Sequence, residues 1–413
     1  MSSTTPSFPL GARWTRTVAG IALLFAALNA VNAINKGGDA AVFFEGGRRL
    51  LHAESLYEGS SAAQGFIGPP FQAVFFAPFA ALAAISTVAA RLLWHVAGIG
   101  CLIVGVACTV RSWSLARDEL GLPAETRAAS VLVPLVAVLL PIQTNFEHQN
   151  MNPLLLALIA AATWLLVRGL DGRAGLLLGV AIALKVFPAL LLIVLLSRER
   201  WRAAGAAVTT ALVLTLVPLM LYGADGFADL LRDFWRLANS GFPARGNNQS
   251  LLAALDRLFG SGDGEFIHQA AGPTLIVFVF LAALLLIGLS AAGIKTRAPA
   301  IATTTLQMWS ALVAAVLLSP IAWDHYWVLL FPAMFVLYDS RDQRLLGGRS
   351  RYAFWLTAML ITGFSRALVG RQVFSLARAS SAYTIAGAIA FVALMGLCVT
   401  MAWNRKTASG IGT

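Results

Sequence analysis

The chain has 413 residues, of which 58% are hydrophobic and 12% are charged, and its mean hydropathy is +0.76. Water-soluble proteins of this length have a smaller apolar fraction, and here the apolar residues form long runs that are typical of transmembrane helices. The net charge of +11 comes from short basic clusters beside these runs, which excludes a nucleic-acid-binding soluble domain and favours contact with anionic lipids.

The hydrophobic runs predict an all-α polytopic membrane protein, residues 1–413 forming one domain with about twelve spans. The first run follows Arg13 and Arg16 and is interpreted as a retained span rather than a signal peptide. The expected spans are residues 15–34, 70–87, 91–112, 128–141, 151–168, 174–197, 203–222, 273–294, 299–318, 321–338, 352–369 and 382–403.

Basic residues in short loops predict the orientation, because cytoplasmic loops carry an excess of Lys and Arg. With the N-terminus inside, the two large polar loops, 35–70 and 223–272, fall on the extracytoplasmic side of the cell membrane. The basic segments that fall inside are 198–202, 295–297, 341–351 and 405–406. Loops 111–127 and 168–173 also contain arginines but fall outside, and a re-entrant piece among the spans before residue 200 is the alternative that would resolve this conflict.

The first external loop, residues 35–70, holds many of the ionisable residues. Asp39 follows the first span and would lie at the membrane–water boundary, where a carboxylate can act as a general base on a sugar or lipid hydroxyl. The alternative is that Asp39 is the N-cap of a helix over residues 40–51. Arg48 either binds phosphate bidentately or pairs with Glu45 on an exposed helix face.

Two polar features interrupt the following apolar runs. The cluster 147–152, which includes Asn150, lies next to a short span and is either a site at membrane depth or a loop that caps the next helix. Lys185 lies within an apolar run, where a cation costs roughly 2.5–3.5 kcal/mol, so it is expected to face a cavity or a counter-charge. Pro188 predicts a helix break beside it.

The second external loop contains apolar residues at helical spacing, which predict amphipathic helices over 225–238 and 251–259. Arg245, Asn248 and Gln249 lie between them and suit sugar hydroxyls and phosphates, or else belong to a loop and helix cap. The outer turn at 319–327 contains Asp324 and His325, which serve a phosphate or a proton, or simply belong to an interfacial aromatic belt. The spacing of these residues predicts no metal site.

Several segments in order are similar to glycosyltransferase family 87, the polyprenol-phosphate-mannose-dependent mannosyltransferases with the GT-C membrane fold. The resemblance covers about residues 35–340, and its individual segments are short. They are Gly38-Asp39 with residues 41–57, Pro69-Pro70-Phe71 through Pro78, Gln149–Asn152, Ala183–Pro188, Asn248–Leu251, and Ser319-Pro320 with Trp323-Asp324-His325.

The resemblance implies a GT-C bundle of about twelve helices with juxtamembrane helices in the first external loop. It implies a polyprenyl-phosphate-linked sugar donor such as the mannose derivative, a glycolipid or glycan acceptor on the outer face, inversion, and Asp39 as general base. His325, Arg245 and Lys185 would stabilise the leaving phosphate. The other residues expected to bind the donor are Asn248, Gln249, Asp324, Arg48 and Asn150.

No cofactor or metal is required by this chemistry, and no nucleic-acid partner is expected. The alternative function is a transporter or flippase of a lipid-linked glycan. Such proteins tend to contain inverted repeats with paired broken helices, whereas this sequence contains one evident break, at residues 185–188.

Overall fold

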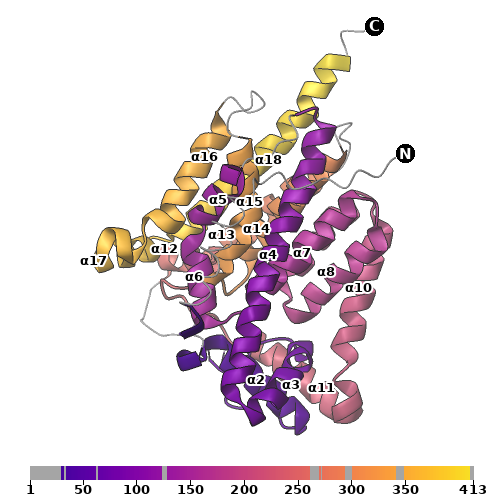
Figure 1. Ribbon diagram of the computed structural model, residues 1–413, viewed down its shortest axis with the longest axis vertical. Helices are drawn as coiled ribbons and strands as arrows, with labels where there is room; N and C mark the ends of the chain where they lie inside the picture. The colour runs from indigo at the N-terminus through magenta and orange to yellow at the C-terminus, as the bar shows by residue number, and fades with distance from the viewer. Residues whose placement is uncertain are drawn as a thin grey trace.

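The computed structural model describes residues 29–31, 34–61, 64–122, 128–260, 269–270, 272–293, 300–340 and 348–409. These residues form helices and loops, with isolated bridges but no strand among them. Figure 1 shows an elongated helical bundle, so the all-α prediction is confirmed for the described residues. Most of the first expected span, the segment 295–297 and much of 341–351 lie outside them.

Most expected spans coincide with helices or helix pairs. The helices are α3 Pro70–Ile85, α4 Thr87–Glu119, α5 Ala128–Ala137, α6 Leu139–His148, α7 Asn152–Val167, α8 Asp171–Leu184, η1 Phe187–Leu191, α9 Leu192–Ser197, α10 Trp201–Leu216, α13 Gly272–Gly293, α14 Ala300–Leu318, η2 Asp324–Leu330, α15 Phe331–Asp339, α16 Arg349–Ala358, η4 Met359–Gly363 and α18 Ala382–Ser409. Among the described residues, four helices are long and apolar enough to cross a membrane, or up to seven if each bent pair is one span.

The remaining helices are α2 Gly38–Leu51, α11 Leu219–Ala238, α12 Leu251–Phe259 and α17 Arg366–Ala379. The amphipathic helices expected over 225–238 and 251–259 are therefore confirmed. The chain bends by 90° between α10 and α11, and again between α16 and α17. In α11 the apolar side buries Phe227 and Leu230, while Trp235 remains exposed, as expected for a helix with one packed face.

The helix α3 packs along α2 and stays at the same end of the bundle. Figure 1 shows α2, α3 and α11 together at the lower end of the bundle. A Cβ added to Gly47 of α2 would lie 2.8 Å from the backbone of Phe76 in α3, so glycine permits this close approach. The expectation that residues 70–87 cross the membrane is therefore not supported: α4 begins where α3 ends, at the same end of the bundle.

The chain reverses direction at Lys185. Residues 174–197, which were expected to form one span, therefore do not cross the bundle in a single direction. Gly175 packs on Ala203, and Gly179 packs on Ala207, which shows that α8 and α10 run in the same direction. The chain must therefore return between them, through η1 and α9. Lys185 has extended backbone angles at the end of α8, and Pro188 cannot continue that helix, as its sequence predicted.

Basic residues gather at the opposite end of the bundle from α2. Contacts between helix ends show this, since most of them join different helices. They are Arg111 and Arg168 over Trp164, the ion pair Arg117–Asp339, and the ion pair Arg200–Asp171. The last turns of α4 from residue 111 onward, the following residues to 122 and the segment 168–173 thus lie at the same end as 198–202, which corrects their expected placement on the opposite side.

The central helix α14 supports the bundle from inside. Nearly all its residues are buried, including Trp309 and Gln307. At its end towards α2, Ala315 and Leu318 line a cavity. The fold therefore places one wall of that cavity on its most buried helix.

Candidate functional site

A cavity of about 660 Å³ lies between α2, the α6–α7 turn, the break after α8, and α11. Its polar lining includes the side chains of Asp39, Asn150 and Lys185. Most of the remaining wall is apolar or aromatic, and includes Phe43, Ile67, Pro69, Phe187, Leu190, Phe234, Trp235, Trp323 and Tyr326. A few convergent polar groups in an apolar pocket are typical of a binding or catalytic site.

Asp39 reaches this cavity because two glycines precede it. The N-cap of α2 is Gly37, and Asp39 lies in the first helical turn, so the interpretation of Asp39 as the N-cap is wrong. Gly38 has φ +46°, and an added Cβ would lie 2.4 Å from the carbonyl oxygen of His148. A glycine is therefore needed for α2 to approach the end of α6, where the Asp39 carboxylate meets Asn150.

Asn150 connects the carboxylate to the cation. Its Nδ2 donates to Asp39 Oδ2 at 2.7 Å, and its Oδ1 accepts from Lys185 Nζ at 3.4 Å. Lys185 Nζ also donates to Asn152 Oδ1 at 3.2 Å and lies 3.8 Å from the ring centroid of Tyr326. The lysine is thus held by amide oxygens and an aromatic face rather than by a carboxylate, as in a cation–π contact.

His325 is the second ionisable group beside Asp39. Its Nε2 lies 3.6 Å from Asp39 Oδ2, just beyond hydrogen-bond range. The carbonyl oxygen of His325 accepts from Asn152 Nδ2 at 3.1 Å, and its ring lies 5.4 Å from that of His148. The structure therefore brings together four of the expected site residues, from α2, the α6–α7 turn, the α8 break and η2.

Asn152 and Tyr326 contact this group but were not singled out from the sequence. Asn152 holds both Lys185 and the backbone of His325. Both residues belong to clusters that were recognised in the sequence, the polar cluster 147–152 and the aromatic turn 319–327. Their individual roles depend on contacts between segments far apart in the chain, which the sequence alone does not reveal.

Asn248 and Gln249 do not line the cavity. Asn248 Nδ2 donates to the carbonyls of Pro243 and Pro320, at 2.8 and 2.9 Å, and its Oδ1 accepts from the backbone N–H of Ala322 at 2.9 Å. Gln249 Nε2 donates to the carbonyl of Arg378 at 2.8 Å. Asn248 thus attaches the loop before α12 to the turn before His325, and Gln249 attaches it to α17, so neither amide faces the cavity.

Asp324 and Arg245 also lie outside the cavity lining. Buried Asp324 forms an ion pair with Arg378 of α17, although it is adjacent in sequence to His325. Arg245 is exposed, and its carbonyl accepts from Arg257 Nη1 at 3.2 Å.

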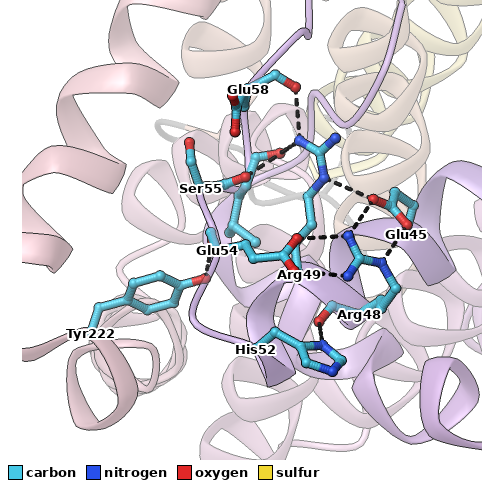
Figure 2. A network of polar contacts seen from close by, with 9 residues as sticks. Glu45, Arg48, Arg49, His52, Glu54, Ser55, Glu58 and Tyr222 are labelled. Carbon is cyan, nitrogen blue, oxygen red and sulfur yellow. Dashed lines mark hydrogen bonds and ion pairs between the residues drawn. The ribbon is translucent and has the colours of Figure 1, made fainter.

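Arg48 belongs to a separate polar network at the C-terminal end of α2, which Figure 2 shows. It bonds to Glu45 at 2.9 Å and to Glu54 at 2.7 Å, while Arg49 bonds to Glu45 at 2.9 Å. The hydrogen bonds from Arg48, with a smaller contribution from Arg49, lower the pKa of Glu45 to about 2. The ion-pair interpretation of Arg48 therefore describes its contacts in the structure.

The arrangement provides an exposed carboxylate, a cation nearby and an apolar wall. The Asp39 side chain is 32% exposed, so it can meet a hydroxyl that enters the cavity. Lys185 can meet a phosphate in the same cavity. Within the ranges that the structure describes, no three His, Cys, Asp or Glu side chains are grouped to hold a metal ion.

Comparisons with known proteins agree on one family. The family model described as glycosyltransferase family 87 matches residues 66–320, which include Asn150 and Lys185. A Mycobacterium tuberculosis polyprenol-phosphate-mannose-dependent alpha-(1-2)-phosphatidylinositol mannoside mannosyltransferase is 27% identical over 81% of this chain and 76% of its own length. Its Mycolicibacterium smegmatis counterpart is 30% identical over 79% of this chain and 74% of its own length.

A polyprenol-phosphate-mannose-dependent alpha-(1-2)-phosphatidylinositol pentamannoside mannosyltransferase from another M. tuberculosis strain is 30% identical over 78% of this chain and 71% of its own length. No solved structure matches the chain.

Proposed function

The chain belongs to glycosyltransferase family 87, and from this premise we propose that it transfers mannose from a polyprenol-phosphate-linked donor to a glycolipid or glycan acceptor. The observation that carries the proposal is the placement of Asp39 and Lys185 in one cavity, on either side of Asn150. Glycosyl transfer from a lipid phosphate needs a base for the acceptor hydroxyl and a cation for the departing phosphate.

In the proposed reaction, the Asp39 carboxylate removes the proton of an acceptor hydroxyl as its oxygen attacks the anomeric carbon. The bond from that carbon to the phosphate oxygen breaks on the opposite face, and polyprenyl phosphate leaves with the electron pair. The attack from the opposite face inverts the anomeric centre. Lys185 stabilises the charge that develops on the leaving phosphate, and Asn150 fixes the carboxylate by its 2.7 Å hydrogen bond.

His325 is assigned to the proton path. Its Nε2 is near Asp39 Oδ2, so the neutral ring can accept a hydrogen bond from the carboxyl group once that group has taken the proton. The apolar wall formed by residues such as Ile67, Leu190 and Leu318 suits the prenyl chain of the donor. The donor would thus lie with its phosphate towards Lys185 and its tail along this wall.

We place the cavity on the extracytoplasmic side, as part of a multi-pass cell-membrane protein of the GT-C type. The support is the gathering of basic helix ends opposite α2, because basic segments favour the cytoplasmic side. When α3 remains beside α2 and the chain reverses at Lys185, segments 111–122, 168–173 and 198–202 share that basic end. The conflict in the sequence-based orientation is thereby removed.

Transfer from radiolabelled polyprenyl-phosphate mannose into a phosphatidylinositol mannoside, with purified protein in liposomes, tests the proposal. We expect a labelled glycolipid whose new linkage has the anomeric configuration opposite to that of the donor. A retained configuration would contradict direct attack by the acceptor. Absence of transfer from any lipid-linked sugar would contradict the assigned reaction.

A further inference from the structure

A second, smaller cavity of about 310 Å³ lies between the loop after α2 and the helix α11. Its lining consists of three serines, one tyrosine, one ion pair and one leucine. These residues are Tyr57, Ser60, Ser61, Asp233, Arg236, Leu237 and Ser240. None of them takes part in the proposed reaction.

The small cavity adjoins the large one. Leu237 lines both cavities. Tyr57 lines the small cavity and donates its hydroxyl, at 2.9 Å, to the carbonyl of Gly68, which lines the large cavity. A ligand that is long enough can therefore contact Asp39 with one end and the small cavity with another part.

The loop that forms one wall is fixed in place. Figure 2 shows its contacts: Arg49 Nη1 donates to the carbonyl of Glu58 at 2.7 Å, and Tyr222 of α11 donates to the carbonyl of Glu54 at 2.7 Å. The ring of Tyr57 also packs against Phe234 of α11, with 6.0 Å between centroids. The wall is thus built by specific contacts, to which the Arg48 and Arg49 network contributes.

The charges of the small cavity indicate the class of its ligand. Asp233 Oδ1 and Arg236 Nη2 are 2.9 Å apart, so the carboxylate and the guanidinium balance each other. A balanced pair gives no net attraction to phosphate, but its donors and acceptors suit sugar hydroxyls, as do three serine hydroxyls. A neutral sugar therefore fits this cavity better than an anionic group does.

We propose that the small cavity is an acceptor subsite, which binds neutral sugar residues of the glycan headgroup next to the hydroxyl that reacts at Asp39. This inference rests on the proposed function for its assignment to the acceptor. It separates the two substrates by charge: the donor phosphate binds near Lys185, and the neutral acceptor sugar binds between Tyr57 and Asp233.

Two matched variants of α11 test the subsite. Asp233→Asn changes the carboxylate that lines the cavity, while Asp229→Asn changes one that forms an exposed ion pair with Arg232 one turn earlier and lines neither cavity. Binding of a deacylated, water-soluble phosphatidylinositol mannoside headgroup to the purified protein is measured by calorimetry. We expect roughly tenfold weaker binding for Asp233→Asn, because a charged hydrogen-bond acceptor is lost, and no change for Asp229→Asn.

In the transfer assay, the same Asp233→Asn variant should raise the acceptor KM by roughly tenfold and leave the donor KM unchanged. Equal headgroup binding by both variants, or no binding by the wild type, would overturn the subsite. Stronger binding of inorganic phosphate by Asp233→Asn at this cavity, without weaker headgroup binding, would assign an anionic ligand instead. If the wild type binds the headgroup through Asp233 but transfers no mannose, the subsite holds and the proposed reaction fails.

Discussion

Two clusters of charged residues at opposite ends of the bundle are built differently. At the basic end, Arg117 Nη1 bonds to both carboxylate oxygens of Asp339, at 2.9 and 3.0 Å, and Trp113 donates to the same carboxylate at 2.8 Å. At the cavity end, Asp39 and Lys185 do not pair directly but meet through Asn150. One cluster is closed by its own partners, and the other faces a cavity.

The difference separates charges that hold the fold from charges that are available to a ligand. The side chains of Arg117 and Asp339 are 8% and 5% exposed, so each depends on the other for compensation. Asp39 retains 32% exposure and has a single short hydrogen bond from a neutral amide. A partly exposed carboxylate beside a cavity can meet a substrate hydroxyl, whereas a buried carboxylate that is bound by arginine cannot.

Breaking the closed cluster should have the largest effect on stability. Arg117→Met leaves the Asp339 carboxylate buried without its cation, which we expect to destabilise the fold by about 3–5 kcal/mol. The melting temperature in detergent measures the loss. The control is Arg232→Met, which breaks an exposed ion pair with Asp229 and should change stability by less than about 0.5 kcal/mol. Equal melting temperatures for the two variants would show that the closed cluster does not hold the fold.

Removing the cation from the cavity-end cluster of Asp39, Asn150 and Lys185 should lower catalysis rather than stability. Lys185→Met removes the charge next to the cavity, and we expect a transfer rate roughly 10²–10³-fold lower per folded protein. Lys36→Met, at an exposed lysine before α2, is the control and should transfer at the normal rate. A Lys185→Met variant that folds poorly but transfers normally once folded would reassign this lysine to the structure.

The network of Figure 2 should give the smallest effect, and one that depends on pH. The pKa of Glu45 falls from 4.5 to about 2 on folding, so its stabilising contribution is present above pH 4.5 and is lost as the pH falls towards 2. Because Glu45 is 42% exposed, we expect less than about 1 kcal/mol. Glu45→Gln should remove this part of the acid dependence, and unchanged acid unfolding curves would contradict it.

The apolar runs predicted where the helices lie in the sequence, but they did not predict at which end of the bundle each connecting segment lies. The helix α3 is apolar and 16 residues long, which makes it resemble a span, yet it packs beside α2. Lys185 and Pro188 did predict a break, but not that the chain reverses there. A local sequence pattern predicts which residues are buried and where a helix ends. The direction of the next helix depends on packing between helices, such as that of Gly175 on Ala203.

The candidate site was predictable in part for the same reason. Lys185 stands out because a cation is costly within an apolar run, and Asp39 because it follows the first span at the membrane boundary; both line the cavity. Asn248 and Gln249 have the right chemistry for a sugar, but their amides bind backbone groups. The contact between Asp39 and Asn150 joins residues 111 positions apart, and no pattern in either segment specifies it.

The most direct test compares two carboxylate variants in the mannose-transfer assay, with each rate divided by the amount of folded protein. The account predicts that Asp39→Asn keeps the wild-type melting temperature and transfers roughly 10²–10⁴-fold more slowly, because the general base is lost. It predicts that Asp339→Asn has a lower melting temperature, while the molecules that remain folded transfer at close to the wild-type rate. Transfer by Asp39→Asn at the wild-type rate would contradict the claim that the open carboxylate performs the chemistry.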